Sequence, residues 1–420
     1  MRDIFIEILT TIKHNRLRTA LTGFSVAWGI FILIVLLGAG NGLINATMGN
    51  SSRYLSTSMV VSGGATSKAY DGLGENRDVQ LNDKDFNITS NGFPNNVKSV
   101  GAELSLQGET LVNGSDYTTG INLSGIYPND VEINKRTMIC GRFINELDLK
   151  ERRKSIVISS DMAKELLPQS PLSLNGQIIR TTTLAFRVVG IYESQKNSMG
   201  NEAFIPFTTF RAIYNKGDKT GNIVFSFSNL NSEAENEAFE SDYRARINRQ
   251  HRAAPDDENA IWIWNRFTQA LSMNTATGLL RTALWVIGIL TLISGIVGVS
   301  NIMLITVRER THEFGIRKAI GAKPWSILRL IIIESIVITT FFGYIGMVLG
   351  IAANLYMDAT IGQETIDNGL FAIQMFTNPT VGIDVCVKAT LLMIVAGTLA
   401  GMVPARKAAK IRPIEALRAE

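Results

Sequence analysis

The sequence predicts an integral membrane α-helical protein with four transmembrane helices and one large α+β domain outside the membrane. Three observations lead to this fold class. Hydrophobic residues make up 46% of the 420 residues, and the mean hydropathy of +0.14 exceeds the usual soluble range. Aliphatic residues gather in four runs, and a long polar stretch separates the first run from the second. Of the 41 lysines and arginines, 15 lie in three short segments beside these runs.

The four apolar runs are long enough to span a bilayer. A helix needs about 20 apolar residues to cross the hydrocarbon core, which offers no partner for a free backbone N–H or C=O. Residues 19–52, 282–307 and 335–357 contain no charge. The fourth run is charge-free only between Lys388 and Arg406, so Lys388 must reach the interface with its long side chain. The first run is longer than a signal-peptide core and lacks a clear cleavage site, so we interpret it as a retained anchor.

Positive charges predict the orientation. They occupy the N-terminal lead, the connection between the second and third spans, and the tail, whereas residues 354–383 contain neither lysine nor arginine. Under the positive-inside rule both termini are cytoplasmic, and the large domain faces out from the membrane. This placement explains the net charge of +4 without a nucleic-acid partner. The charged residues are Arg2, Lys13, Arg16, Arg18, Arg308, Arg310, Arg317, Lys318, Lys323, Arg329, Arg406, Lys407, Lys410, Arg412 and Arg418.

The predicted organisation follows the chain in order. It comprises a cytoplasmic amphipathic helix (1–18), the first span (19–42), the outer domain (43–278), the second span (279–307), a cytoplasmic connection (308–324), the third span (325–355), a short outer loop (356–383), the fourth span (384–405) and a cytoplasmic tail (406–420).

Each span carries two small residues one helical turn apart. Such spacing lets helix backbones approach closely, within one chain or between two copies. The alternative, that glycine is simply frequent in membrane helices, stays open. The span interiors lack charged residues of the kind that mark an ion pathway, which weighs against a channel or secondary transporter. The small residues are Gly38, Gly42, Ser294, Gly298, Gly346, Gly350, Gly397 and Gly401.

Two cytoplasmic segments have helical patterns. Apolar residues from Ile4 to Ile12 recur at helical spacing and predict an amphipathic helix on the inner leaflet, with an ordinary basic flank as the alternative. The connection after Arg308 has a charged helical pattern, and Gly321 before Lys323-Pro324 signals a helix stop and restart. This segment is either a docking helix or a solvated loop that supplies orientation charges.

Strand and helix patterns alternate in the outer domain, which predicts two sub-lobes, one of βαβ type and one inserted between its halves. In the helix over 232–250, glutamates come first and arginines last, matching the helix dipole, and Phe239, Tyr243 and Ile247 form a buried stripe. Asp161 is the expected N-cap of a shorter helix. Strands are expected over 58–62, 100–111, 118–125, 155–159, 177–182, 186–193, 222–228 and 260–264, and helices over 82–89, 161–167 and 232–250.

Several chemistries are excluded. The phosphate-binding motif G-x-x-x-x-G-K-[ST] needs a Gly-Lys dipeptide, which the chain lacks, so ATP hydrolysis is expected elsewhere. The histidines His14, His251 and His312 are scattered, so we expect neither a metal site nor a catalytic histidine. Cys140 and Cys386 lie in different regions and are expected to be inert thiols.

Four motifs carry a family resemblance. The run ERTHEFGIRKAIGAKPWSIL, with Glu334-Ser335 opening the next span, resembles the cytoplasmic signature of the FtsX-like and MacB-like permeases, the type VII ABC transporters. The tail PARKAAKIRPIEALRAE is similar to their ending, where a proline leaves the last span. GRFINELD and SIVISSDMAKELLP resemble the MacB periplasmic core domain. The resemblance implies a MacB periplasmic-core type outer domain, with a porter-like βαβ lobe plus an inserted lobe.

The resemblance also implies a coupling helix over Glu309–Ala322 that docks on a separate cytoplasmic ABC ATPase subunit. That partner would hold ATP and Mg, while this chain would carry no cofactor, no metal and no enzymatic activity. His312 and Phe314 depart from the commoner choices at their positions. The contact residues implied are Glu309, Arg310, Glu313, Ile316, Arg317 and Gly321.

The function implied is that of a multi-pass ABC transporter permease subunit in the bacterial inner (plasma) membrane, working as a homodimer or with a similar permease. It would couple ATP hydrolysis to a periplasmic conformational change (mechanotransmission) and drive efflux of a lipophilic small molecule, peptide or similar cargo. A periplasmic adaptor, an outer-membrane channel and membrane lipids are the other partners implied. Two alternatives stay open: a lipoprotein-releasing permease and an FtsX-like regulator of cell-wall hydrolases.

Overall fold

The computed structural model describes residues 16–51, 54–181, 184–194, 202–361, 366–367, 372–373 and 376–410. The chain divides into two compact units. Unit 1 contains 1–47, 275–364 and 374–420, and unit 2 contains 48–274 and 365–373. The predicted amphipathic helix lies outside the described residues, apart from 16–18, and so does the tail from 411 onward.

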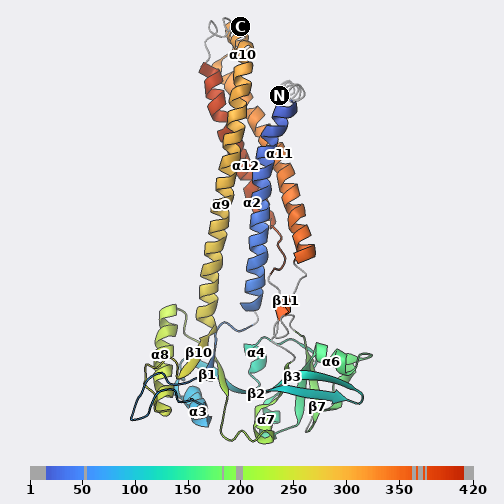
Figure 1. The fold of residues 1–420 in the computed structure, drawn as a ribbon, viewed down its shortest axis with the longest axis vertical. Helices are drawn as coiled ribbons and strands as arrows, with labels where there is room; N and C mark the ends of the chain where they lie inside the picture. Colours follow the sequence, from blue (N-terminus) through green and yellow to red (C-terminus); the bar gives the residue numbers. More distant parts are fainter. Residues whose placement is uncertain are drawn as a thin grey trace. The chain divides into compact units, whose positions relative to one another are not determined.

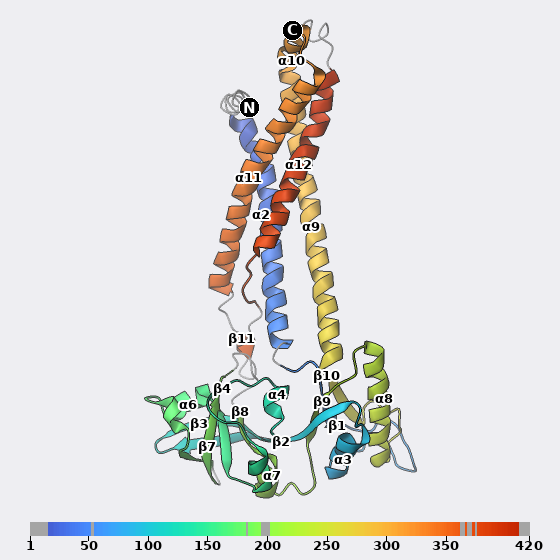
Figure 2. The ribbon, with the colours of Figure 1, turned by 180° about the vertical axis from the view of Figure 1, so that it is seen from behind.

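Long helices form unit 1, and four of them are long and apolar enough to cross a membrane, by length and composition (Figure 1). Figure 2 shows them from behind. Their apolar side chains share one core, which includes Ile30, Leu292, Ile331 and Ala396. The helices of this unit, including a short one in the connection, are α2 (Arg16–Ser51), α9 (Arg266–Glu309), α10 (Thr311–Ala319), α11 (Pro324–Thr360) and α12 (Ile383–Lys410).

The predicted stop and restart between α10 and α11 is confirmed. Gly321 has φ +100°, a left-handed conformation that glycine adopts without strain. Pro324 opens α11, where its missing N–H needs no partner. Helix α12 contains Pro404 and continues past it to Lys410. A proline removes one backbone hydrogen bond but can kink a helix without ending it.

Unit 2 is built on a ten-stranded sheet with the order β10-β1-β9-β2-β3-β8-β5-β7-β4, while β6 pairs with β2 and β7. All of the strands predicted from the sequence form. The strands are β1 (Ser58–Gly63), β2 (Val97–Asn113), β3 (Asp116–Ile126), β4 (Met138–Gly141), β5 (Ser155–Ser159), β6 (Ile178–Arg180), β7 (Ala185–Tyr192), β8 (Glu202–Pro206), β9 (Asn222–Phe227) and β10 (Ile261–Asn265).

Two interleaved β-α-β units make one part of this sheet. Strands β1 and β2 are joined through α3 (Asp83–Gly92), and β9 and β10 through α8 (Glu233–Gln250). Because β9 pairs antiparallel with both β1 and β2, and β1 pairs antiparallel with β10, each unit brackets a strand of the other. The predicted stripe of α8 is confirmed, since Phe239, Tyr243 and Ile247 are buried in the core of this part.

The chain between β2 and β9 forms the rest of the sheet, around a second core that includes Leu123, Ile156, Met162 and Phe210. Strand β2 is 17 residues long and takes part in both regions, pairing with β9 early and with β3 later. The helices of this region are α4 (Asp130–Ile133), α5 (Glu146–Lys150), α6 (Ser160–Leu166) and α7 (Phe207–Ile213), with a 3₁₀ turn over Pro171–Leu174.

Two details of unit 2 correct the sequence interpretation. Ser159 caps α6, not Asp161, because its Oγ accepts a hydrogen bond from the Met162 N–H at 3.2 Å. Strands β4 and β8 were not predicted from periodicity, since four or five residues are too few to show a period. Between α11 and α12, the short strands β11 (Ile366–Asp367) and β12 (Ala372–Ile373) pair antiparallel.

Candidate functional site

Helix α11 approaches α2 through glycines. A Cβ built on Gly346 would lie 2.2 Å from the Ala27 carbonyl oxygen, so only glycine allows this contact. One turn later, a Cβ on Gly350 would lie 2.8 Å from Ile34. The predicted pair therefore lies at a close contact between two backbones.

Asn354 extends this contact. Its side chain is buried, and its Nδ2 donates to the Ile34 carbonyl at 2.9 Å, which ties α11 to α2 by a hydrogen bond away from water. Gly38 makes room for it, because a Cβ there would overlap the Asn354 amide. A Cβ on Gly42 would overlap the Phe376 ring at 2.8 Å, and the Gly42 carbonyl accepts from the Thr377 N–H at 3.1 Å.

Helices α11 and α12 pack through the other predicted glycines. A Cβ on Gly397 would meet Thr339 Oγ1 at 2.1 Å, and one on Gly401 would meet Ser335 Cβ at 2.8 Å. The Ser335 hydroxyl donates to the Gly397 carbonyl at 2.9 Å. Both positions thus serve contact within one chain.

On α9 the small-residue contact is displaced by one position. Ser294 is exposed, whereas its neighbour Gly295 would place a Cβ 3.1 Å from the Ser25 carbonyl oxygen. A Cβ built on Gly298 would lie 3.5 Å from Ser25 Oγ, an ordinary van der Waals contact. One residue turns a helix by about 100°, so Ser294 points away from α2. The spacing of small residues therefore predicts the position of a helix contact only to within one residue.

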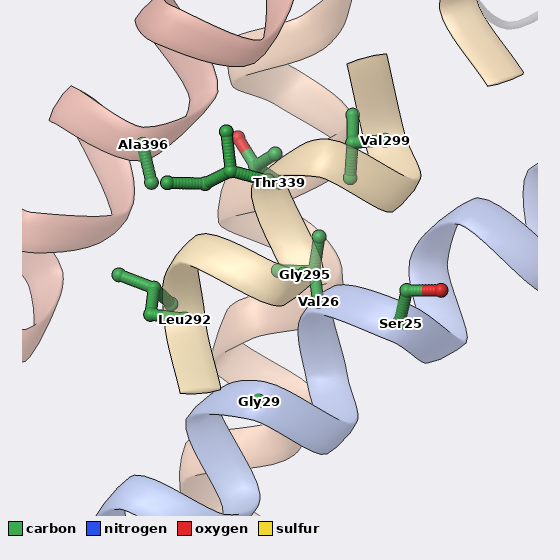
Figure 3. A pocket seen from close by; sticks show the side chains of 9 residues that line it. Ser25, Val26, Gly29, Leu292, Gly295, Val299, Thr339 and Ala396 are labelled. Atoms are coloured by element: carbon green, nitrogen blue, oxygen red, sulfur yellow. The ribbon is translucent and has the colours of Figure 1, made fainter. Parts of the chain in front are cut away.

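A small void lies where the four long helices meet (Figure 3). Side chains from all four contribute, among them Val26, Leu292, Thr339 and Ala396. Its volume of about 10 Å³ equals the space of one water molecule. This void is too small to hold a cargo molecule.

Helix α10 is fastened to the bundle on its inner side. Phe314 is buried in the bundle core, and the Arg310 guanidinium lies over its ring at 5.4 Å. Arg310 also pairs with Glu313 at 2.9 Å and with the buried carboxylate of Glu334, on α11, at 3.7 Å. Lys318 Nζ donates to the Ala409 carbonyl, on α12, at 2.6 Å. Helix α10 is therefore attached to both α11 and α12.

The opposite side of this segment exposes apolar residues. Ile316 is 40% exposed, Ile320 82% and Trp325 70%, although charged residues surround them in sequence. Among the predicted contact residues, Glu309, Glu313 and Gly321 are also exposed, Arg317 is partly buried, and Arg310 is mostly covered. Ile320 and Trp325 were not predicted as contact residues. They could have been predicted from the sequence, because each is an apolar residue beside the turn at Gly321 in an otherwise charged segment.

In unit 2, the segments that enter and leave the sheet meet at α4. The Ile133 carbonyl accepts from the Leu55 N–H at 2.8 Å and from Arg266 Nη1 at 3.5 Å. Arg266 is the first residue of α9, and its guanidinium lies over the Tyr54 ring at 4.0 Å. Chain segments that are distant in sequence are thus joined at one point.

A buried charge cluster continues from α4 into the sheet. Arg136 pairs with Asp130 at 2.7 Å and with Glu202 at 3.3 Å, and it stacks on Phe204 at 4.0 Å. Burial alone would lower the pKa of Arg136. The carboxylates of Asp130 and Glu202 have the larger effect, so the pKa of Arg136 is raised. Burial raises the pKa of Glu103 to about 7, and the charges of Asp130 and Glu202 add to this shift. The cluster therefore contains one acid that titrates near neutral pH.

The described residues contain no group of three or more His, Cys, Asp or Glu side chains that could hold a metal ion. His251 Nε2 instead lies within hydrogen-bonding distance of Asp85 Oδ2, at 2.8 Å, and Asp85 belongs to the capping box of α3. Cys140 and Cys386 are both free thiols.

These features define the class: a multi-pass helical protein that carries a short charged helix in one connection and a large α+β domain in another. Residues 19–245 match the family model described as the MacB-like periplasmic core domain. Residues 285–413 match the FtsX-like permease C-terminal model. The chain belongs to the MacB-like and FtsX-like permease family of ABC transporters.

The chain is also similar to curated proteins. The chain is 26% identical over 424 residues to the macrolide export ATP-binding/permease protein MacB of Bdellovibrio bacteriovorus, covering 98% of this chain and 60% of that protein. It is 28% identical over 311 residues to the uncharacterized ABC transporter permease YknZ of Bacillus subtilis, covering 72% and 71%. The chain thus spans about 60% of the length of the MacB relative. The crystal structure of the periplasmic region of MacB from Actinobacillus actinomycetemcomitans matches at 19% identity, covering 54% of this chain and 96% of that one, with a TM-score of 0.43.

Proposed function

We propose that this chain is the permease subunit of an ABC transporter and passes the work of a partner ATPase to the folded domain by mechanotransmission. In this proposal the partner binds ATP and Mg²⁺, and this chain carries no cofactor of its own. The α10 connection faces the cytoplasm and unit 2 faces the other side of the inner membrane, as the positive charges beside the spans indicate.

The observation that carries the proposal is the two-sided character of α10. Phe314, Arg310 and Lys318 fasten it to α11 and α12, while Ile316 and Ile320 remain exposed. An exposed apolar side chain beside charged residues is typical of a protein-binding surface. A partner that docks there could move α10, α11 and α12 as one body.

Movement of the helices would reach unit 2 at α4, where Leu55 and Arg266 both donate to the Ile133 carbonyl. Residues 54–58 and Arg266 both bind the α4 segment, and α4 leads through Asp130 to Arg136 and Glu202. We propose that a displacement of either connecting segment is carried along these contacts. The two cores of unit 2 would act as a porter-like βαβ lobe and an inserted lobe.

We propose efflux of a lipophilic small molecule or peptide as the transport activity. The support is the match along nearly the whole chain to a protein whose name describes macrolide export. A second permease copy, a periplasmic adaptor and an outer-membrane channel would complete the machine.

The test is co-purification of the tagged full chain from its native membranes, followed by identification of bound ATPases. We expect the wild-type chain to retain an ABC ATPase and the double variant Ile316→Glu/Ile320→Glu to lose it, because two buried carboxylates would face the partner without compensation. Leu172→Glu is the matched control, since Leu172 is 54% exposed in unit 2.

Retention of the ATPase by the double variant at the wild-type level would refute the docking surface. Loss of the ATPase in Leu172→Glu as well would show a general effect of added charge. ATP hydrolysis by the purified assembly provides a second readout, which should fall only in the double variant.

A further inference from the structure

A basic groove lies in unit 2, in the region between β2 and β9. It has a volume of about 590 Å³, and its cationic lining residues are Arg142, Arg153, Lys154 and Arg187. They come from three places in the chain: the end of β4, the start of β5 and the middle of β7. The groove is separate from the proposed ATPase-docking surface, so either can fail without the other.

The sheet register brings these groups together. Ser155 pairs with Arg187 in the parallel β5–β7 ladder, and the Arg187 N–H donates to the Lys154 carbonyl at 2.8 Å. Across the antiparallel β6–β7 pair, Ile178 lies opposite Arg187. A lysine, an arginine and an isoleucine are therefore neighbours on one side of the groove.

The buried carboxylate of Asp148 holds Arg142, one of the arginines of the groove, in place. The Asp148 carboxylate is completely buried, and its Oδ1 accepts from Arg142 Nη2 at 3.0 Å. Arg142 also donates to the Phe143 carbonyl at 2.9 Å. Burial would raise the pKa of Asp148, but its hydrogen bonds from Arg142 and the Asn145 backbone lower it, so it stays ionised. Arg142 is nevertheless 42% exposed, which leaves part of its guanidinium available to a ligand.

The groove has an excess of positive charge. Asp148 and Glu151 pair with Arg142 and Arg153. Among the described residues, Lys154 and Arg187 form no salt bridge. Like charges held this close repel one another, and an anion bound between them would relieve the repulsion.

One wall of the groove is apolar. Phe186 forms part of the lining and is buried, whereas Ile178 is 60% exposed at the mouth. A purely ionic ligand such as phosphate would leave this isoleucine uncovered. An anionic group attached to an apolar body would cover it and gain from removing its surface from water.

We propose that this groove binds an anionic amphiphile, with its phosphate or carboxylate group between Lys154 and Arg187 and its apolar part against Ile178. Arg142 would provide further hydrogen bonds to the anionic group. Such a ligand is either a soluble molecule or the headgroup region of an acidic lipid, since both present the same chemistry.

The experiment measures binding of phenyl phosphate and of inorganic phosphate to the purified full chain in a neutral detergent, by calorimetry. We expect phenyl phosphate to bind roughly tenfold more tightly than inorganic phosphate, and added salt to weaken both. Lys154→Ala/Arg187→Ala should weaken phenyl phosphate binding by at least about tenfold. Lys84→Ala/Lys98→Ala removes two charges from exposed positions outside the groove and should bind like wild type.

A third variant tests the apolar wall. Ile178→Ser should abolish the preference for phenyl phosphate and keep the weaker binding of inorganic phosphate. Equal losses in Lys154→Ala/Arg187→Ala and Lys84→Ala/Lys98→Ala would overturn the site, as would a wild-type chain that binds neither probe. No preference for phenyl phosphate in the wild type would overturn the amphiphilic part.

The source of the ligand is separated by repeating the titration in nanodiscs of phosphatidylcholine with and without phosphatidic acid. Competition by phosphatidic acid supports an acidic lipid as the occupant, and unchanged phenyl phosphate binding supports a soluble one. Thermal unfolding of each variant checks that the folded state is retained.

Discussion

Glu103 shows how a single side chain can make the folded domain sensitive to pH. Its carboxyl lies near Asp130 and Glu202, and its pKa of about 7 exceeds the value of about 4.5 expected in an unfolded chain. The folded state therefore binds more protons than the unfolded state between these two values. Stability contributed by the protonated form is complete below pH 4.5 and is lost as the pH rises through 7.

We predict that Glu103→Gln removes this dependence, because glutamine stays neutral. Between pH 5 and pH 8 the melting temperature of the full chain in detergent should fall less for the variant than for the wild type. At pH 8 the variant should be the more stable, by up to about 3 kcal/mol. The measurement is thermal unfolding followed by circular dichroism.

Glu165→Gln is the control for this experiment, since Glu165 is exposed on α6. Its melting temperature should follow the wild type at every pH. If Glu103→Gln and Glu165→Gln show the same pH profile, the Glu103 carboxyl does not titrate as proposed.

Two residues show where the role predicted from the sequence differs from the contact in the structure. Arg310 matched a contact position in the family motif, but the structure pairs it with Glu334, 24 residues later, and covers most of its side chain. Ser159 took the capping role expected of Asp161 because its backbone is extended, with ψ 158°, at the end of β5. Partner choice depends on backbone geometry and on distant residues, which residue type alone does not contain.

The contact between helices α2 and α11 depends on the absence of a side chain at Gly346. We predict that Gly346→Ala destabilises the bundle by about 1–3 kcal/mol, because the new methyl group would overlap the backbone of Ala27, which has little freedom to move. The measurement is thermal unfolding of the full chain in detergent.

The matched control is Gly278→Ala. No atom lies within 4 Å of a Cβ built at Gly278, and alanine favours a helix over glycine by about 1 kcal/mol. This variant should be as stable as the wild type or slightly more stable. Equal destabilisation by both substitutions would show that the α2–α11 contact is not the cause.

The ion pair that attaches α10 to α11 gives another prediction. Arg310→Glu should lower ATP hydrolysis by the purified assembly several-fold, because the new carboxylate at position 310 would face the buried carboxylate of Glu334. The exchange Arg310→Glu/Glu334→Arg should recover part of the activity, since it restores opposite charges. If the exchange is no better than the single substitution, the pair does not couple these helices.

Elements differ in how well the sequence predicts them. The strand over 155–159 and the helix ending at Gln250 were found from local patterns, since β5 is entirely buried and α8 has a capping box at Ser232. Strand β8 escaped because its five residues show no period, although it pairs with the middle of the sheet. On α9 the predicted contact position was wrong by one residue: the sequence pattern indicated Ser294, whereas Gly295 faces α2.

The orientation of the chain in the membrane is the prediction on which the proposed function depends. We predict that Gln169→Cys is labelled by a membrane-impermeant maleimide in intact spheroplasts, and that Lys323→Cys is labelled only after permeabilisation. Both side chains are exposed, so access to the reagent depends on the side of the membrane.

Both substitutions are made in a Cys140→Ser/Cys386→Ser background, because the two native thiols are free. Labelling of both positions before permeabilisation would contradict the orientation. The reverse pattern would place α10 outside the cytoplasm, where a cytoplasmic ATPase could not reach it.

The sequence predicts the number of long helices and the position of the large domain, because hydrophobic runs and their lengths are local properties. It does not predict the sheet order, because β1 pairs with β10 across about 200 residues of intervening chain. The interleaving of the two β-α-β units depends on such long-range pairs, which no local pattern specifies.

The pairing of β1 with β10 has a consequence for how this architecture could diversify. Met59 lies opposite Asn265, so the chain enters and leaves the large domain through adjacent strands. Everything between these two residues therefore forms a cassette whose ends are already neighbours. Evolution, or a protein engineer, could exchange that cassette for another with the same end-to-end spacing and leave the membrane helices as they are.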